Sequence, residues 1–184
     1  DSEKGILRGF TTIMLIRYEI DGKPLNGVFS GDTIIDEEFR GQTELIRVWL
    51  NFVFNLAKND PARLYWFLIS KGYKTYKLLP LCFIDFYPRF DKSTPPEVKK
   101  IIDSFALKKF KEEYNCETGI VAPIGATDYL KSARNDITPH RLKDPHVNFF
   151  VKKNPNFWKG EELACLTEIH KKNLSKFGLK IVNF

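Results

Sequence analysis

A short polar segment between a strand-like and a helix-like stretch carries residue types that bind phosphate. Its sequence is Arg40-Gly41-Gln42-Thr43, and an apolar run follows it to Ala57. Gly41 has no side chain, so a phosphate could approach its backbone closely, while Arg40 and Thr43 offer a charge and a hydroxyl group. The first free N–H groups and the positive dipole end of a following helix would converge on the same point. The segment therefore predicts an anion-binding turn.

The same residues leave a simpler interpretation open. Glu38 and Glu44 bring negative charge to this turn, which disfavours a diphosphate there. The segment contains neither the Gly-x-x-x-x-Gly-Lys pattern of a P-loop nor the Gly-x-Gly-x-x-Gly pattern of a dinucleotide site. A plain connection between a strand and a helix with an acidic first turn is the alternative hypothesis.

The stretch before the turn predicts a β-hairpin. Residues 10–20 are rich in β-branched and apolar side chains, an Asp-Gly-Lys-Pro turn signal follows, and residues 25–35 continue as a second strand. Gly27 and Gly31 weaken that strand unless a bulge or a close approach requires them. They fit either a strand that a ligand approaches or a bulge without a ligand.

The stretch after the turn predicts a helix over 43–58 that is buried nearly all round, ended by an Asn-Asp-Pro sequence. The continuous apolar run 63–70 is typical of a central strand covered on both faces. The order strand, strand, helix, strand makes the helix a crossover, so the two strands that it joins should be parallel.

The rest of the chain predicts short elements, while residues 71–89 stay unassigned. Thr94, followed by proline and then by Glu97, is typical of a helix start. The predicted elements are a helix from Thr94 to about Asn115, a strand over 119–123, a helix over 145–153 capped by Asp144, a helix over 161–176 and a last strand over 179–184.

The order of strand, Arg-Gly turn, long apolar helix and apolar strand, over about residues 10–76, resembles the acyl-CoA-binding core of the GNAT superfamily of N-acyltransferases. The family motif, Gln/Arg-x-x-Gly-x-Gly/Ala, ends the fourth strand and opens the third helix. In one register Glu38, Gly41 and Thr43 take the motif places. In the other register, Arg40 occupies the first motif position, and Thr43 and Leu45 stand where the motif has its two glycines. We favour the first, because Gly41 then lies where the backbone meets the pyrophosphate.

The resemblance implies roles for particular residues. In that family a carboxylate on or near the fourth strand often deprotonates the amine, and a tyrosine after the fifth strand often protonates the departing thiolate. The implied catalytic residues are Asp32, Glu37, Tyr73 and Tyr76, and the implied cofactor-binding residues are Ile34, Ile35, Arg40, Gly41, Gln42 and Thr43. A polar hairpin residue and packing tyrosines are the alternative interpretations.

Composition narrows the function classes. The chain of 184 residues is 43% hydrophobic and 14% aromatic, enough for a sizeable core. Its three cysteines show no paired spacing, which argues against a disulfide framework or a zinc site. No apolar run approaches the length of a membrane span. Residues 61–184 carry 22 Lys and Arg against 13 Asp and Glu, spread through helical patterns, so a solvated surface is favoured over nucleic-acid binding.

We therefore predict an α/β (α+β) protein with a GNAT-like mixed central sheet flanked by helices. Residues 1–90 would form the acyl-CoA-binding core, and residues 91–184 a helical and mixed part, an α-rich C-terminal elaboration packing on the same domain. The predicted activity is transfer of an acyl group from acetyl-CoA or a longer acyl-CoA to an amine, in a small molecule or a peptide, by direct attack. The alternative is a non-catalytic GNAT-like binding module with a degenerate cofactor site.

Three further expectations concern the setting of the protein. The cysteine usage favours a reducing, cytoplasmic compartment, no bound metal is expected, and a homodimer is left open. The chain starts at Asp1 without a methionine, which suggests that an N-terminal portion is missing.

Overall fold

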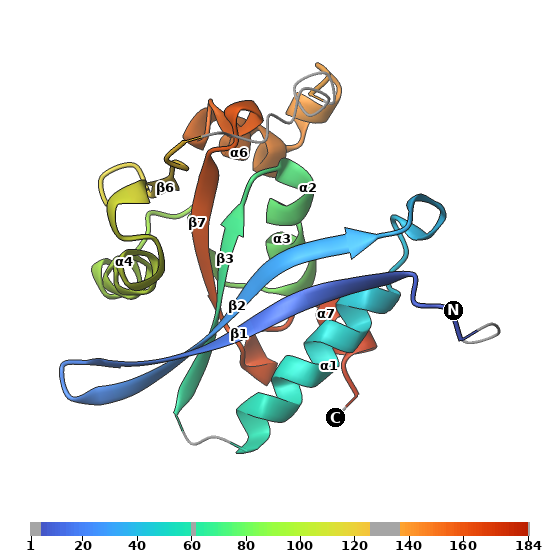
Figure 1. Ribbon diagram of the computed structural model, residues 1–184, viewed down its shortest axis with the longest axis horizontal. Helices are drawn as coiled ribbons and strands as arrows, with labels where there is room; N and C mark the ends of the chain where they lie inside the picture. Colours follow the sequence, from blue (N-terminus) through green and yellow to red (C-terminus); the bar gives the residue numbers. More distant parts are fainter. Residues whose placement is uncertain (1–4, 60–61, 126–136, 184) are drawn as a thin grey trace.

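The computed structural model describes residues 5–59, 62–125 and 137–183 and contains one seven-stranded sheet in the order β1-β2-β3-β7-β6-β5, with β4 paired to β7 (Figure 1). Only the pair β2 and β3 is parallel among the strand pairs of these residues. The strands are β1 (Gly9–Ile20), β2 (Lys23–Ile35), β3 (Arg63–Ser70), β4 (Phe86–Tyr87), β5 (Tyr114–Asn115), β6 (Ile120–Val121) and β7 (Glu162–Glu168).

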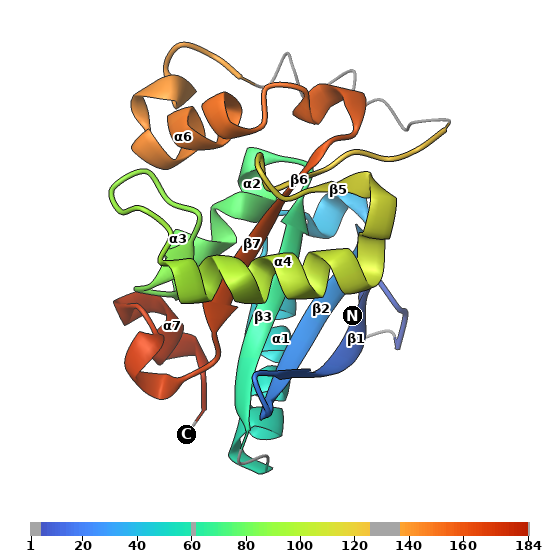
Figure 2. The same ribbon diagram turned by 90° about the vertical axis from the view of Figure 1, so that its left-hand side faces the viewer.

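Helices cover both faces of the sheet. On one face lies α4 alone, and on the other lie α1, α2, α3 and α7, with α6 beyond the end of β3 (Figures 1 and 2). The α-helices are α1 (Glu44–Asn59), α2 (Tyr73–Tyr76), α3 (Leu78–Cys82), α4 (Pro96–Phe110), α6 (Pro145–Lys153) and α7 (Lys176–Ile181). Each face has its own apolar core, because the strands between them are buried on both sides.

The first half of the chain has the predicted element order. β1 and β2 form an antiparallel hairpin, and α1 connects β2 to the parallel strand β3, whose bounds match the predicted run. The expectation that α1 is buried all round is wrong: Val48 and Phe52 are 63% and 47% exposed. The helix is amphipathic, since its apolar residues on the sheet side already fill that face.

Gly27 is explained by helix packing and not by the approach of a ligand. A Cβ atom on Gly27 would lie 2.8 Å from the ring of Phe105 on α4, so only glycine lets this helix pack directly on β2.

The second half of the chain corrects the predicted C-terminal elaboration. The helix expected over 161–176 is instead the strand β7, which lies between β3 and β6 in the sheet, followed by the 3₁₀ turn Lys171–Asn173. The strand expected over 179–184, whose last residue lies outside the described residues, is replaced by α7, which ends at Ile181. β7 is buried on both faces, so its sequence lacks the alternation that marks a strand with one exposed face. Residues 91–184 therefore complete the central sheet instead of adding an α-rich appendage to it.

The predicted helix caps had mixed outcomes. The carboxylate of Asp144 accepts hydrogen bonds from the N–H groups of His146 and Val147, which confirms the cap of α6. Helix α4 instead begins at Pro96 with Pro95 as its N-cap, so Thr94 does not cap it, and the helix ends at Phe110. In the described residues, every helix is too short or too polar to cross a lipid bilayer.

Candidate functional site

The parallel strands β2 and β3 separate before they end. Their pairing runs from Leu25 and Arg63 to Phe29 and Phe67. Beyond that point β2 continues to Ile35 and β3 to Ser70, but the two strands no longer pair with each other. Figure 1 shows them diverging. The sheet thus opens into a V-shaped gap at the ends of two parallel strands, where α/β proteins commonly bind ligands.

A β-bulge in β2 lies at this gap. Thr11 pairs with Thr33 and Ile13 pairs with Ser30, so two residues of β2 oppose the single residue Thr12. A Cβ atom on Gly31 would overlap the hydroxyl oxygen of Thr12, so a larger residue fits at the bulge only if the Thr12 side chain moves. The bulge turns the end of β2 away from β3, because bulges bend the strand that carries them.

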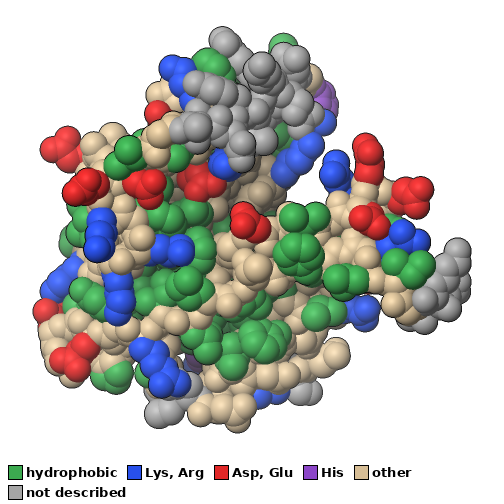
Figure 3. Space-filling view, in the orientation of Figure 1, with side chains coloured by type: hydrophobic (Ala, Val, Ile, Leu, Met, Phe, Trp, Pro, Cys, Tyr) green, Lys and Arg blue, Asp and Glu red, His purple; other side chains and the backbone are tan. Residues whose placement is uncertain are grey.

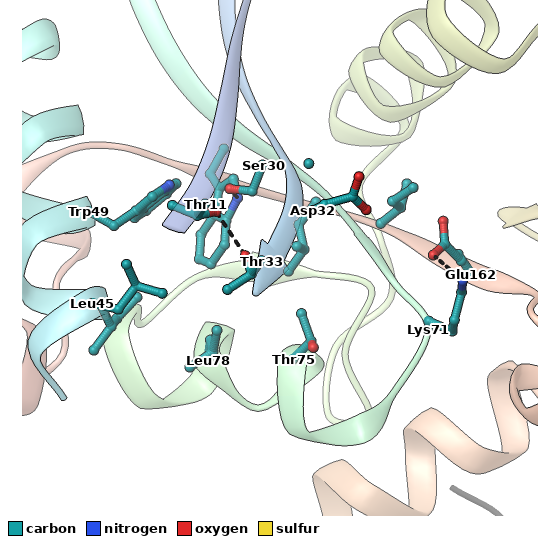
Figure 4. Close-up of a pocket in the computed structure, with 15 residues that line it drawn as sticks. Thr11, Ser30, Asp32, Thr33, Leu45, Trp49, Lys71, Thr75, Leu78 and Glu162 are labelled. Atoms are coloured by element: carbon teal, nitrogen blue, oxygen red, sulfur yellow. Dashed lines mark hydrogen bonds and ion pairs between the residues drawn. The ribbon is translucent and has the colours of Figure 1, made fainter. Parts of the chain in front are cut away.

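A pocket of about 290 Å³ occupies the gap on the α1 face (Figure 4). One end is apolar and is formed by α1, β3 and the start of α3. The other end carries Asp32, Lys71 and Glu162, and Figure 4 shows Lys71 and Glu162 facing each other. The lining residues used below are Thr11, Thr33, Leu45, Trp49, Trp66, Thr75 and Leu78.

A second hollow, of about 540 Å³, reaches the gap from the α4 face. Lys109 and Phe110 of α4 line it, together with side chains of β1. The two hollows share six lining residues, namely Ser30, Gly31, Asp32, Ile69, Lys71 and Glu162. Because these residues surround the gap, the charged end of the pocket can be approached from both faces of the sheet.

Glu162 is the titratable side chain at the centre of this arrangement. Burial raises the pKa of its carboxyl group, the Lys71 ammonium 3.7 Å away lowers it in part, and the negative charges of Asp32 and Glu113 raise it further. A carboxylate with a raised pKa is a suitable general base. Glu162 was not expected in the site, because residues 161–176 were predicted to form a helix. The apolar centre of Glu-Leu-Ala-Cys-Leu-Thr-Glu is the pattern that could have indicated a buried strand here.

The two carboxylates expected to be catalytic lie in different places. Asp32 is at the bulge, is exposed and lines both hollows. Glu37 lies in the 3₁₀ turn Glu37–Phe39 after β2, is exposed and lines neither hollow. The structure therefore brings Asp32 to Glu162 and leaves Glu37 outside the gap.

The expected tyrosines do not line the pocket. Tyr73 and Tyr76 lie on α2 with their side chains buried, whereas Thr75 between them faces the pocket (Figure 4). The hydroxyl group of Tyr76 donates a hydrogen bond to the carbonyl oxygen of Pro88 at 2.9 Å, and burial raises the pKa of this phenol. These contacts assign Tyr76 to packing.

Replacing Tyr76 by phenylalanine should therefore act on stability. We expect the free energy of unfolding to fall by about 1–2 kcal/mol, because the carbonyl group of Pro88 loses its donor. Urea denaturation measures this loss. A loss of ligand binding at the pocket with unchanged stability would instead give the phenol a role in the site.

The expected cofactor-binding turn lies beside a separate hollow that adjoins the pocket. Gly41 has a φ of +85° with open space around its Cα, and Arg40 Nε donates to the carbonyl oxygen of Ile35 at 3.3 Å. Gln42 and Ile35 line a third hollow, of about 770 Å³, beside the N-terminus of α1. Leu45 lines both this hollow and the pocket, so the two are adjacent.

Two further residues expected to bind the cofactor, one in the turn and one at the end of β2, are exposed. Thr43 is exposed, and its carbonyl oxygen accepts the N–H of Arg47 in the first turn of the helix. The side chain of Ile34 is 58% exposed and lines none of these three hollows. Glu44 is the first residue of α1, so a carboxylate accompanies the helix N-terminus.

In the described ranges, no three His, Cys, Asp or Glu side chains are grouped to hold a metal ion. Comparison of this chain with protein families, with curated proteins and with solved structures found no match.

Proposed function

We propose that this protein is a GNAT-like N-acyltransferase that moves an acyl group from an acyl-CoA to an amine. The main support for this proposal is the separation of the parallel strands β2 and β3. It gives a long, narrow ligand with polar amides access to the edge of β2 that faces β3 beyond Phe29, and strand backbone is a ready partner for amide groups. The apolar end of the pocket suits the methylene and methyl groups of a pantetheine arm.

The two hollows supply separate entrances for the two substrates. The acyl-CoA would lie on the α1 face, with its pyrophosphate beside Gly41 and the N-terminus of α1. The amine would enter from the α4 face and reach the same charged end. Direct attack needs both reactants in one complex, which this arrangement permits.

The reaction would be a single displacement through a tetrahedral intermediate. The amine nitrogen forms a bond to the thioester carbon, its proton passes to the carboxylate of Glu162, and the bond from carbon to sulfur breaks to release the CoA thiolate. Lys71 faces Glu162 and would stabilise the negative charge of the departing sulfur. Asp32, as a second carboxylate at the gap, helps to keep the pKa of Glu162 raised.

The test is calorimetric titration of the folded protein with acetyl-CoA and with a long-chain acyl-CoA. We expect micromolar binding that is lost in Gly41→Glu, because the new carboxylate would lie where the phosphates bind. Gly22→Glu is the matched control: Gly22 also has a positive φ and open surroundings, but it lies in the hairpin turn. Both substitutions carry a similar backbone strain of about 1–2 kcal/mol.

A non-catalytic binding module is the second candidate, favoured by the acidic residues Glu37, Glu38 and Glu44 around the turn. It predicts no binding of either acyl-CoA at millimolar concentration. That result, obtained with a folded wild-type protein, would reject the transferase.

A further inference from the structure

One hydrogen-bond donor in the pocket has no acceptor. The side chain of Trp49 is 5% exposed, and its indole N–H is buried without a hydrogen-bond partner among the residues that the structure describes. The neighbouring indole of Trp66 differs, since its N–H donates to the hydroxyl oxygen of Ser30 at 3.0 Å. A buried N–H without an acceptor carries a desolvation cost that a correctly placed ligand oxygen would remove.

The position of Trp49 along the pocket limits what that oxygen can belong to. Trp49 lies five residues after Glu44, about 7.5 Å along the axis from the start of α1. Figure 4 shows its ring reaching from α1 toward Thr11, while Lys71 and Glu162 lie at the opposite end. The donor therefore lies more than one helical turn from the N-terminus of α1, at the end of the pocket away from Lys71 and Glu162.

Resting on the proposed function, we propose that the Trp49 indole N–H donates a hydrogen bond to an amide carbonyl oxygen of the pantetheine arm. The phosphates would lie at the helix N-terminus and the thioester at the charged end, so the arm is what passes Trp49. The apolar side chains of Leu45, Leu78 and Trp66 around it suit an arm with uncharged amides and exclude a phosphate. Trp49 is thus a specificity residue for pantetheine.

Binding must shift a neighbouring side chain, because the indole nitrogen has no contact with solvent. Thr11 and Thr33 form an exposed hydroxyl pair, 2.8 Å apart, on the same pocket wall. Because the Trp49 ring reaches toward Thr11 (Figure 4), we expect the Thr11 side chain to rotate when the arm enters, with the backbone unchanged.

Nuclear magnetic resonance of the full chain with ¹⁵N-labelled tryptophan tests the hydrogen bond directly. The chain has three tryptophans, and the signal of Trp49 is assigned with the Trp49→Phe variant. On titration with CoA, and separately with pantetheine, the indole proton of Trp49 should move downfield. The signal of Trp158, which lies outside the pocket in the 3₁₀ turn Phe157–Lys159, should stay in place.

Calorimetry of the folded Trp49→Phe variant is the second experiment. We expect the affinities for CoA and pantetheine to fall about tenfold, with the affinity for adenosine 3′,5′-bisphosphate unchanged, since that probe lacks the arm. If wild type binds CoA but the Trp49 signal stays unmoved at saturation, this inference is overturned and the transferase proposal stands. If wild type does not bind CoA, both are overturned.

Discussion

Replacing Glu162 by glutamine should lower kcat for acyl transfer by about a hundredfold or more, the usual contribution of a general base. The amide cannot accept the proton of the attacking amine, although its size and its place on β7 are unchanged. In the wild type, kcat should rise with pH through the raised pKa of Glu162, because only the ionised carboxylate acts as a base. That rise should be absent in Glu162→Gln. A pH profile of kcat for both proteins measures the difference.

Two variants show whether the effect belongs to Glu162. Glu168→Gln makes the same change at the other end of β7, where the carboxylate pairs with Arg63, and kcat should stay close to the wild type. Asp32→Asn should keep the pH-dependent rise but move it to lower pH, because Asp32 raises the pKa of Glu162. If Asp32→Asn instead abolished the rise while Glu162→Gln kept it, Asp32 would be the base.

The same raised pKa has a consequence for stability, which serves as a folding control. A carboxyl group with a higher pKa in the folded than in the unfolded state binds its proton more tightly when folded. Its contribution is therefore complete below the ordinary pKa of 4.5 and is lost as the pH rises through the folded pKa. Urea denaturation of Glu162→Gln should still show a cooperative unfolding transition, but its free energy of unfolding should lack this decline with pH. A variant with both properties has the native fold and lacks only the titration of Glu162.

Replacing Thr75 by tryptophan should weaken acyl-CoA binding about a hundredfold, because the indole would fill the pocket between β2 and β3. Thr75 faces this pocket from α2 and is exposed, so the larger side chain enters the gap instead of the core. The stability should change by no more than about 0.5 kcal/mol, as for most surface substitutions. Calorimetric titration with acetyl-CoA measures the loss of affinity.

Lys74→Trp is the matched control for this experiment. Lys74 is the neighbouring residue on α2, is exposed and does not line the pocket. Its variant should bind acetyl-CoA within about twofold of the wild type. Equal affinity in wild type and Thr75→Trp would show that acyl-CoA does not use the gap, and the proposed binding mode would have to be abandoned.

The exposed surface of the hairpin adds a feature that the sequence pattern did not reveal. Apolar side chains gather on the face of the molecule seen in Figure 3, and exposed ones on β1 are Phe10, Met14, Leu15 and Tyr18. A strand in the middle of a sheet would bury such residues, whereas β1 is an edge strand and has only β2 beside it. The apolar composition of residues 10–20 could not distinguish the two cases, because it reports the local sequence and not the neighbours of the strand.

The sequence alone determined the elements whose signals are local. An Asp-Gly turn defined the hairpin, the Asn-Asp-Pro sequence ended α1, and Asp144 capped α6, because turns and caps depend on a few adjacent residues. The parallel pairing of β2 and β3 followed from the intervening helix. Only the tertiary structure decided that β7 is a central strand, since burial on both faces removes its periodicity.

The candidate site divides in the same way. The polar turn Arg40 to Thr43 could be identified in the sequence because its residues are contiguous. Asp32 could be identified because it lies on the predicted strand just before this turn. Glu162 joined them only when β7 was placed next to β3, and the pocket exists only because the bulge at Gly31 separates two strands. These depend on pairing between separate strands, β1 with β2 and β3 with β7, which no local pattern encodes, and the three-dimensional packing of the sheet supplies it.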